Sequence, residues 1–106
     1  TNISVGLEFR RVLFRSDLVI EGAKRIVIIE CKLTEVEQGR EQLEKLYFPV
    51  ARLVWPDKKP LGIVAARHLS KCPDVRGVET TLKGAILAAE TQGVIPILHW
   101  MERMPL

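Results

Sequence analysis

The sequence has few of the residues that mark specialised protein classes. In 106 residues it has 2 cysteines, 6% aromatic residues, and no internal repeat or low-complexity tract. Cys31 and Cys72 are too few for a disulfide-stapled secreted domain, and they are not spaced like the close cysteine pairs of zinc sites. His68 and His99 are also isolated in the sequence. We therefore expect no structural zinc site and a reducing, cytoplasmic location.

Long hydrophobic runs are absent as well. No apolar stretch approaches the roughly 20 residues that span a bilayer, and residues 1–16 lack the charged, apolar and small-residue order of a signal peptide. By contrast, 47% of the residues are hydrophobic and 27% are charged, as in a globular and not a disordered chain. A chain of this length accommodates one domain. We expect a single soluble domain with no membrane partner.

The chain also has little excess charge. Its 16 basic and 13 acidic residues give a net charge of +3. Much of this excess lies near the N-terminus, where Arg10, Arg11 and Arg15 outnumber Glu8. From Asp17 onward, 13 basic residues stand against 12 acidic ones. Bulk charge therefore gives no support for nucleic-acid binding.

The apolar pattern predicts the order β-β-α-β-α-β after residue 17. The predicted strands are 18–21, 25–31, 61–66 and 94–100, and the predicted helices are 35–55 and 78–92. Thr34 is the predicted N-cap of the first helix, which Gly39 and Pro49 weaken, and Pro49 could kink it or end its first part. Gly93 is the predicted stop of the second helix, and Pro96 places the last strand near a sheet edge. The predicted fold class is α/β, with a mixed sheet flanked by helices.

The informative charged residues surround the second predicted strand. Asp17 opens the preceding hairpin strand, and Glu30, Cys31 and Lys32 end the second one. Residues two apart in a strand share a face, so Glu30 and Lys32 project together, while Cys31 points away and is expected to be buried. Hairpin pairing would bring Asp17 close to them. Gathered carboxylates suit Mg²⁺, and the Cys31 carbonyl could add a further oxygen ligand.

Such an ion would polarise a phosphate and lower the pKa of a bound water. Lys32 could then stabilise the developing negative charge or position the attacking water. The alternative interpretation of Glu30 and Lys32 is a solvated surface pair, which is common at strand ends. Their position at the end of an uninterrupted apolar run favours a functional role, because an idle buried pair is costly.

Asp17 in SDLVI, with Glu30 and Lys32 in VIIECK, resembles the motif of the PD-(D/E)XK nuclease superfamily, which has the restriction-endonuclease-like fold. That family places its Asp on a hairpin strand and its acid-x-Lys on the next, followed by a helix. GREQLEKLY resembles the helix of exonuclease-type and resolvase-type members, in which a Gln precedes an aromatic residue. Gln42 and Tyr47 are the candidates, at a spacing one residue longer than that pattern. The resemblance implies Asp17 and Glu30 as ligands of Mg²⁺ or Mn²⁺, Lys32 as the catalytic lysine and Gln42 as an auxiliary.

The resemblance further implies a magnesium-dependent deoxyribonuclease, with DNA as substrate, RNA as the other candidate, and homodimers as a common assembly of the fold. The alternative from another class is a non-catalytic nucleic-acid-binding or partner-binding domain that keeps the fold. Metal binding through Asp17 and Glu30 would distinguish the two. Gln42 could instead be an exposed helix amide, and Tyr47 a core residue. Basic side chains that could contact phosphates or stay solvated are Lys58, Lys59, Arg67 and Lys71.

The N-terminus departs from the family pattern. The family core has a helix and a strand before its Asp-bearing strand, and only 16 residues precede Asp17. Residues 8–16, EFRRVLFRS, match the translation of a common short-read sequencing adapter without a mismatch. We therefore expect residues 1–16 to be a non-native segment of a metagenomic reading frame. Residues 17–106 would then form an N-terminally truncated nuclease-like domain.

Overall fold

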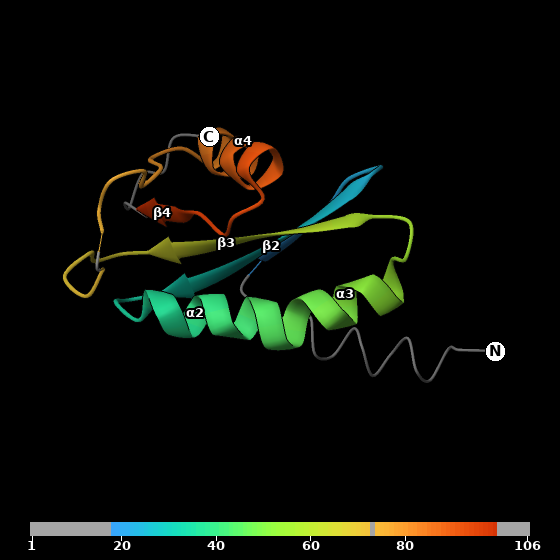
Figure 1. The fold of residues 1–106 in the computed structure, drawn as a ribbon, viewed down its shortest axis with the longest axis horizontal. Helices are drawn as coiled ribbons and strands as arrows, with labels where there is room; N and C mark the ends of the chain where they lie inside the picture. The colour runs from blue at the N-terminus through green and yellow to red at the C-terminus, as the bar shows by residue number, and fades with distance from the viewer. Residues whose placement is uncertain (1–17, 73, 100–106) are drawn as a thin grey trace.

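The computed structural model describes residues 18–72 and 74–99. Its elements are β1 (Leu18–Glu21), β2 (Arg25–Lys32), α2 (Val36–Gln42), the π-helical turn η1 (Leu43–Tyr47), α3 (Phe48–Val54), β3 (Lys59–Ala66), α4 (Leu82–Gln92) and β4 (Ile97–His99). Because α2, η1 and α3 form one continuous helix, the predicted α/β class and element order are confirmed (Figure 1). Within these two ranges, no helix is long and apolar enough to cross a membrane.

The four strands form one mixed sheet in the order β1-β2-β3-β4. β1 is antiparallel to β2, with Leu18 opposite Ile29, whereas β2, β3 and β4 are parallel. β2 lies inside the sheet and is buried from Ile26 to Glu30. The uninterrupted apolar run of this strand thus reflects cover on both of its faces, as predicted.

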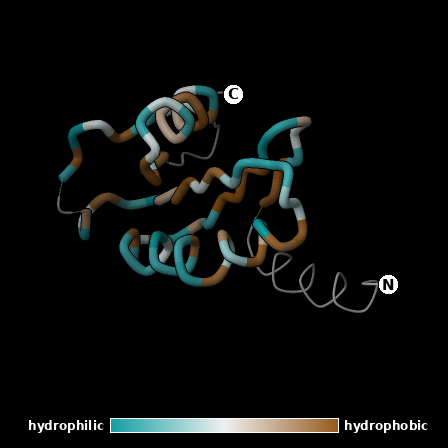
Figure 2. The backbone as a smooth tube through the Cα atoms, turned by 45° about the vertical axis from the view of Figure 1, so that its right-hand side comes forward, coloured by the Kyte–Doolittle hydropathy of each residue, from teal (hydrophilic) through white to brown (hydrophobic). Residues whose placement is uncertain are grey.

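The two faces of the sheet pack against different helices. The helix α2–η1–α3 covers the face that carries Ile26 and Ile28, and α4 covers the face that carries Val27 and Ile29. Figure 1 shows this arrangement, with α4 in orange on one side of the sheet and the long green helix on the other. In Figure 2 the hydrophobic segments of the strands lie between the two helical layers. The domain therefore has three layers and two cores.

A short bridge beyond β4 explains why the two helical layers lie on opposite faces. The Glu79 N–H donates to the Ile97 carbonyl at 2.8 Å, and the His99 N–H donates to the Glu79 carbonyl at 2.9 Å. These bonds use the side of β4 that faces away from β3. After β3 the chain therefore crosses past the position of β4 to the outer side of that strand. From there α4 leads the chain back to β4. The crossover from β2 to β3 and the crossover from Glu79 to β4 thus run in opposite directions across the sheet. Two crossovers of the same hand that run in opposite directions place their helices on opposite faces.

Both helix starts differ from the prediction. Glu35 is the N-cap residue of α2 without a side-chain cap, so Thr34 as N-cap is wrong. Thr34 instead accepts a hydrogen bond on its carbonyl from the Val36 N–H, at 3.0 Å. α4 begins later than predicted, because the Thr81 hydroxyl accepts from the Gly84 N–H at 3.1 Å and fixes the first turn there. Its end was predicted correctly: Gly93 has a left-handed φ of 67°.

Pro49 does not end the long helix. The Phe48 N–H donates to the Leu43 carbonyl, which lies five residues back instead of the usual four. A proline in a helix cannot donate a backbone hydrogen bond, and its ring crowds the preceding turn. The wider π turn directly before Pro49 makes room for that ring. The helix therefore continues through α3 to Val54.

The outer edge of β3 is only partly covered. β4 pairs with Val64–Ala66 alone, and it is shorter than the strand predicted over 94–100. The Val64 N–H donates to the Pro96 carbonyl at 3.1 Å, so the alternating backbone groups of Gly62 and Pro60 point to the same edge. Among the described residues no strand pairs there. Pro60 has no N–H to present to a further strand.

Candidate active site

Glu30 and Lys32 lie on the sheet face covered by α2, as the strand periodicity predicted. Glu30 is only 6% exposed and is the single buried charged residue in the described ranges. The Nζ of Lys32 lies 3.8 Å from Oε1 of Glu30, and the Lys32 side chain is 18% exposed. The interpretation of these residues as a solvated surface pair is therefore wrong. The Glu30 carboxylate lies beneath α2, and the Lys32 ammonium group lies at the rim of the area that this helix covers.

Gly39 allows α2 to approach this pair. A Cβ at Gly39 would lie 3.1 Å from both methyl carbons of Val64 and 3.3 Å from Cγ of Lys32. Val64 is the partner of Glu30 in the β2–β3 ladder. The aliphatic part of Lys32 is thus held between the end of β2 and the helix. In the sequence Gly39 only weakens a predicted helix, whereas in the structure it permits the closest helix–sheet contact at the site.

Gln42 lies on α2 roughly 4.5 Å further along the helix axis than Gly39, close to the same face. α2 runs back over β2, so this step leads from Lys32 towards Glu30. The Oε1 atom of Gln42 is buried and accepts no hydrogen bond from the described part of the chain. Gln42 as a whole is half-buried, so the alternative of an exposed helix amide does not describe its carbonyl oxygen. Tyr47, the second candidate in this segment, is 3% exposed and belongs to the core.

The structure does not place every predicted metal ligand. Asp17 lies outside the described residues, and the described β1–β2 ladder starts with Leu18 opposite Ile29. Between residues 18 and 99, leaving out residue 73, no group of three or more His, Cys, Asp or Glu side chains is arranged to hold a metal ion. Glu30 is the predicted side-chain ligand that the described residues include.

Cys31 is exposed, so the expectation of a buried thiol is wrong. Its side chain points to the α4 face, where the apolar cluster under α4 includes Val27 and Ile29 but does not reach the end of β2. The thiol is thus on the opposite side of the sheet from Glu30 and Lys32. Only the backbone carbonyl of Cys31 was predicted to contribute to a metal site.

The segment after β3 runs alongside the end of β2. The Arg67 N–H donates to the Lys32 carbonyl at 3.1 Å. The Nε2 of His99 lies 3.0 Å from the Arg67 carbonyl, which can only accept, so this nitrogen carries the proton. Lys71 forms an exposed ion pair with Glu35 at 2.6 Å. Arg67 and Lys71, two of the basic residues that could contact phosphates, therefore belong to the segment that runs alongside the end of β2, next to Lys32.

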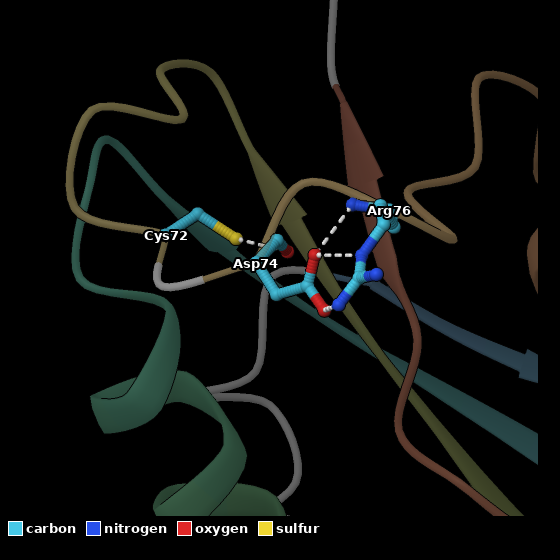
Figure 3. Close-up of polar contacts among 3 residues, drawn as sticks. All are labelled: Cys72, Asp74 and Arg76. Atoms are coloured by element: carbon cyan, nitrogen blue, oxygen red, sulfur yellow. Dashed lines mark hydrogen bonds and ion pairs between the residues drawn. The ribbon is translucent and has the colours of Figure 1, made fainter.

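The loop that follows has a polar cluster of its own (Figure 3). Asp74 Oδ1 accepts from the backbone N–H of Arg76 at 2.9 Å and from its Nε at 3.1 Å, and Oδ2 accepts from Nη2 at 3.2 Å. The Cys72 thiol donates to the Asp74 carbonyl at 3.1 Å. These groups satisfy one another. The cluster therefore shapes the loop through local contacts between Cys72, Asp74 and Arg76.

The Arg76 hydrogen bonds hold the pKa of Asp74 below its ordinary value. Because ionised Asp74 is favoured in the folded state, the associated stability is present above the ordinary aspartate pKa and is lost as the pH falls through the lowered one. Replacing Arg76 with glutamine should therefore raise the pKa of Asp74. Carboxyl NMR titration measures this shift. The pKa of Glu41, which is lowered by Lys45, should not move in the same variant, and an unchanged Asp74 would contradict the assignment.

Comparison with protein families, with curated proteins and with solved structures finds no match to this chain. The described geometry is a mixed α/β sheet with helices on both faces. At the carboxyl end of the interior strand β2 lie a buried carboxylate beneath α2 and, beside it, a partly exposed lysine. Any functional conclusion must be argued from these residues.

Proposed function

We propose that this domain is a metal-dependent nuclease that hydrolyses phosphodiester bonds in DNA, with Glu30 as a metal ligand and Lys32 as the catalytic lysine. Buried Glu30, with Lys32 beside it at the rim, carries the proposal. Glu30 is 6% exposed, and the Nζ of Lys32 lies 3.8 Å from its Oε1. Removing a carboxylate from water is costly, so a buried acid next to a lysine at a strand end points to a functional site.

The proposal requires Asp17 to extend the β1–β2 ladder by one residue. Val19 lies opposite Ile28 and Leu18 opposite Ile29, so the residue before them would lie opposite Glu30. Side chains directly opposite each other on antiparallel strands have Cβ atoms about 5 Å apart. Two carboxylates at that spacing would reach one cation.

The donor set suits a hard divalent ion. The Asp17 and Glu30 carboxylates, the Cys31 carbonyl and the Gln42 amide would all present oxygen atoms, which Mg²⁺ and Mn²⁺ prefer. Gln42 Oε1 is buried and accepts no hydrogen bond from the described residues, so it could serve as a further oxygen ligand. When bound, the ion supplies a Lewis acid that polarises the phosphate and lowers the pKa of a bound water.

The residues of the chain supply orientation and charge. Lys32, packed against Gly39, would donate hydrogen bonds to the phosphate oxygens as negative charge accumulates on them. Glu30 lies beside the Nζ of Lys32 and keeps that group at the strand end. A water oxygen would form the new bond to phosphorus, and the bond to the leaving oxygen of the DNA strand would break.

The proposal is tested by incubating supercoiled plasmid and single-stranded DNA with Mg²⁺, with Mn²⁺ or with EDTA. We expect nicking or degradation only with the metal ions, and none by the Glu30→Gln variant, which keeps the side-chain shape but removes the charge. Titration calorimetry with Mn²⁺ should show at least about tenfold weaker binding to this variant.

Glu41→Gln is the matched control, because Glu41 is an exposed acid on α2 that pairs with Lys45. Cleavage that persists in EDTA, or equal Mn²⁺ affinity in wild type and Glu30→Gln, would refute the proposal. DNA binding with no cleavage in either metal would instead support the non-catalytic binding domain.

A further inference from the structure

A cavity opens at the start of β3, away from Glu30 and Lys32. Its volume is about 550 Å³, within the range of small-ligand sites. The β3 residues that line it, Lys59 to Gly62, precede Val64 and Ala66, which pair with Glu30 and Lys32. The charged and aromatic side chains of its lining are Arg40, Glu44, Phe48, Arg52 and Lys59.

The cavity is lined by three cations and one carboxylate. Arg40 is held in place by two contacts: its Nε donates to the Ile95 carbonyl at 3.2 Å, and its Nη1 donates to Oε1 of Glu37 at 2.7 Å. A guanidinium has five N–H groups, so Arg40 retains donors for a ligand. It is an oriented donor and not a freely rotating surface side chain.

Arg52 and Lys59 have no acidic partner among the described residues. The guanidinium of Arg52 lies over the ring of Phe48, 5.8 Å from its centroid. Two other exposed lysines have ion-pair partners: Lys45 pairs with Glu41 at 2.7 Å and Lys71 pairs with Glu35 at 2.6 Å. The three cations that line the cavity outnumber its single carboxylate, and a bound anion would reduce the repulsion among them.

We propose that this cavity binds a phosphate group. Arg40 and Arg52 come from the continuous helix α2–η1–α3, and Lys59 comes from the start of β3, so the cations stand on two walls of the cavity. Guanidinium and ammonium groups are the side chains that bind phosphate oxygens. An extended peptide added as a strand is disfavoured, because Pro60 has no N–H at this edge. The proposal does not depend on the nuclease proposal, since neither Glu30 nor Lys32 lines the cavity.

The test uses the full chain in EDTA, so that metal chemistry at Glu30 plays no part. Inorganic phosphate, adenosine 5′-monophosphate and a single-stranded oligonucleotide are titrated separately and followed by amide NMR shifts. Arg52→Gln and Lys59→Gln should each weaken phosphate binding about tenfold. Lys24→Gln and Lys83→Gln are the controls, since neither residue lines the cavity, and both should bind phosphate like wild type.

The three probes distinguish the source of the phosphate. A mononucleotide that binds at least as tightly as the oligonucleotide identifies a free nucleotide as the ligand. Tighter binding of the oligonucleotide identifies the nucleic-acid backbone as the ligand. The slope of the logarithm of its affinity against the logarithm of the salt concentration should then decrease by about one for each cation removed. If Arg52→Gln and Lys59→Gln fold normally and bind all three probes like wild type, the proposal is overturned, whether or not the protein cleaves DNA.

Discussion

Replacing Lys32 with methionine should reduce DNA cleavage by roughly 10²- to 10³-fold, as expected when one donor to a developing negative charge is lost. Methionine keeps an unbranched apolar stem, so the packing against Gly39 persists and only the ammonium is removed. Initial rates of plasmid nicking in Mg²⁺ measure the effect. Lys32→Arg should recover little activity, because the planar guanidinium is larger than an ammonium and presents its donors differently.

Two measurements separate a catalytic role for Lys32 from a structural one. Lys45→Met removes an exposed lysine of the long helix that pairs with Glu41, and it should leave the rate unchanged. Thermal unfolding of Lys32→Met should show a loss of no more than about 2 kcal/mol, because the ion pair with Glu30 is long and partly exposed. Wild-type cleavage by a folded Lys32→Met protein would exclude Lys32 from the chemistry.

Replacing Gly62 with valine should destabilise the fold by about 3 kcal/mol or more, as expected for overpacking at a tight contact. Even a bare Cβ at this position would lie 2.6 Å from Cζ and 2.9 Å from Cε1 of Phe48, and 3.1 Å from Cδ1 of Leu43. The glycine is what allows the long helix to pack directly on β3. Urea unfolding followed by circular dichroism gives the free energy of unfolding.

A double variant tests whether the contact with Phe48 causes the loss of stability in Gly62→Val. Phe48→Leu removes the ring atoms nearest to Gly62, so Gly62→Val should cost less free energy of unfolding in the Phe48→Leu background than in wild type. Lys59→Val is the matched control, because it places the same side chain at an exposed position of the same strand and should change stability little. An equal cost of Gly62→Val in both backgrounds would show that the strain lies elsewhere.

The strands could be predicted well because their signal is local. β1 and β2 begin where the sequence predicted, and the placement of Glu30 and Lys32 on one face needs only the two-residue period of a strand. The helix starts could not be predicted as well, because each depends on which side chain reaches a free backbone N–H. Thr34 and Thr81 are both good N-cap residues by type, yet only Thr81 caps its helix with its side chain.

The remaining features depend on tertiary packing. The value of Gly39 at the site follows from its contact with Lys32 and Val64, which no local pattern encodes. The cavity cations Arg40 and Arg52 come together with Lys59 because β4 covers only the end of β3 and leaves its first half open. Sequence reasoning singled out Lys59 as a possible phosphate contact but did not identify the two arginines.

The π turn also bears on how the chain tolerates changes in length. In a π turn a residue bonds to the one five positions ahead, so η1 holds one more residue per turn than an α-helix would. Gln42 lies directly before η1, and Tyr47, at the end of η1, stays in the core. A wide turn of this kind lets a helix hold one additional residue locally, while α2 and α3 on either side keep their separate contacts with the sheet.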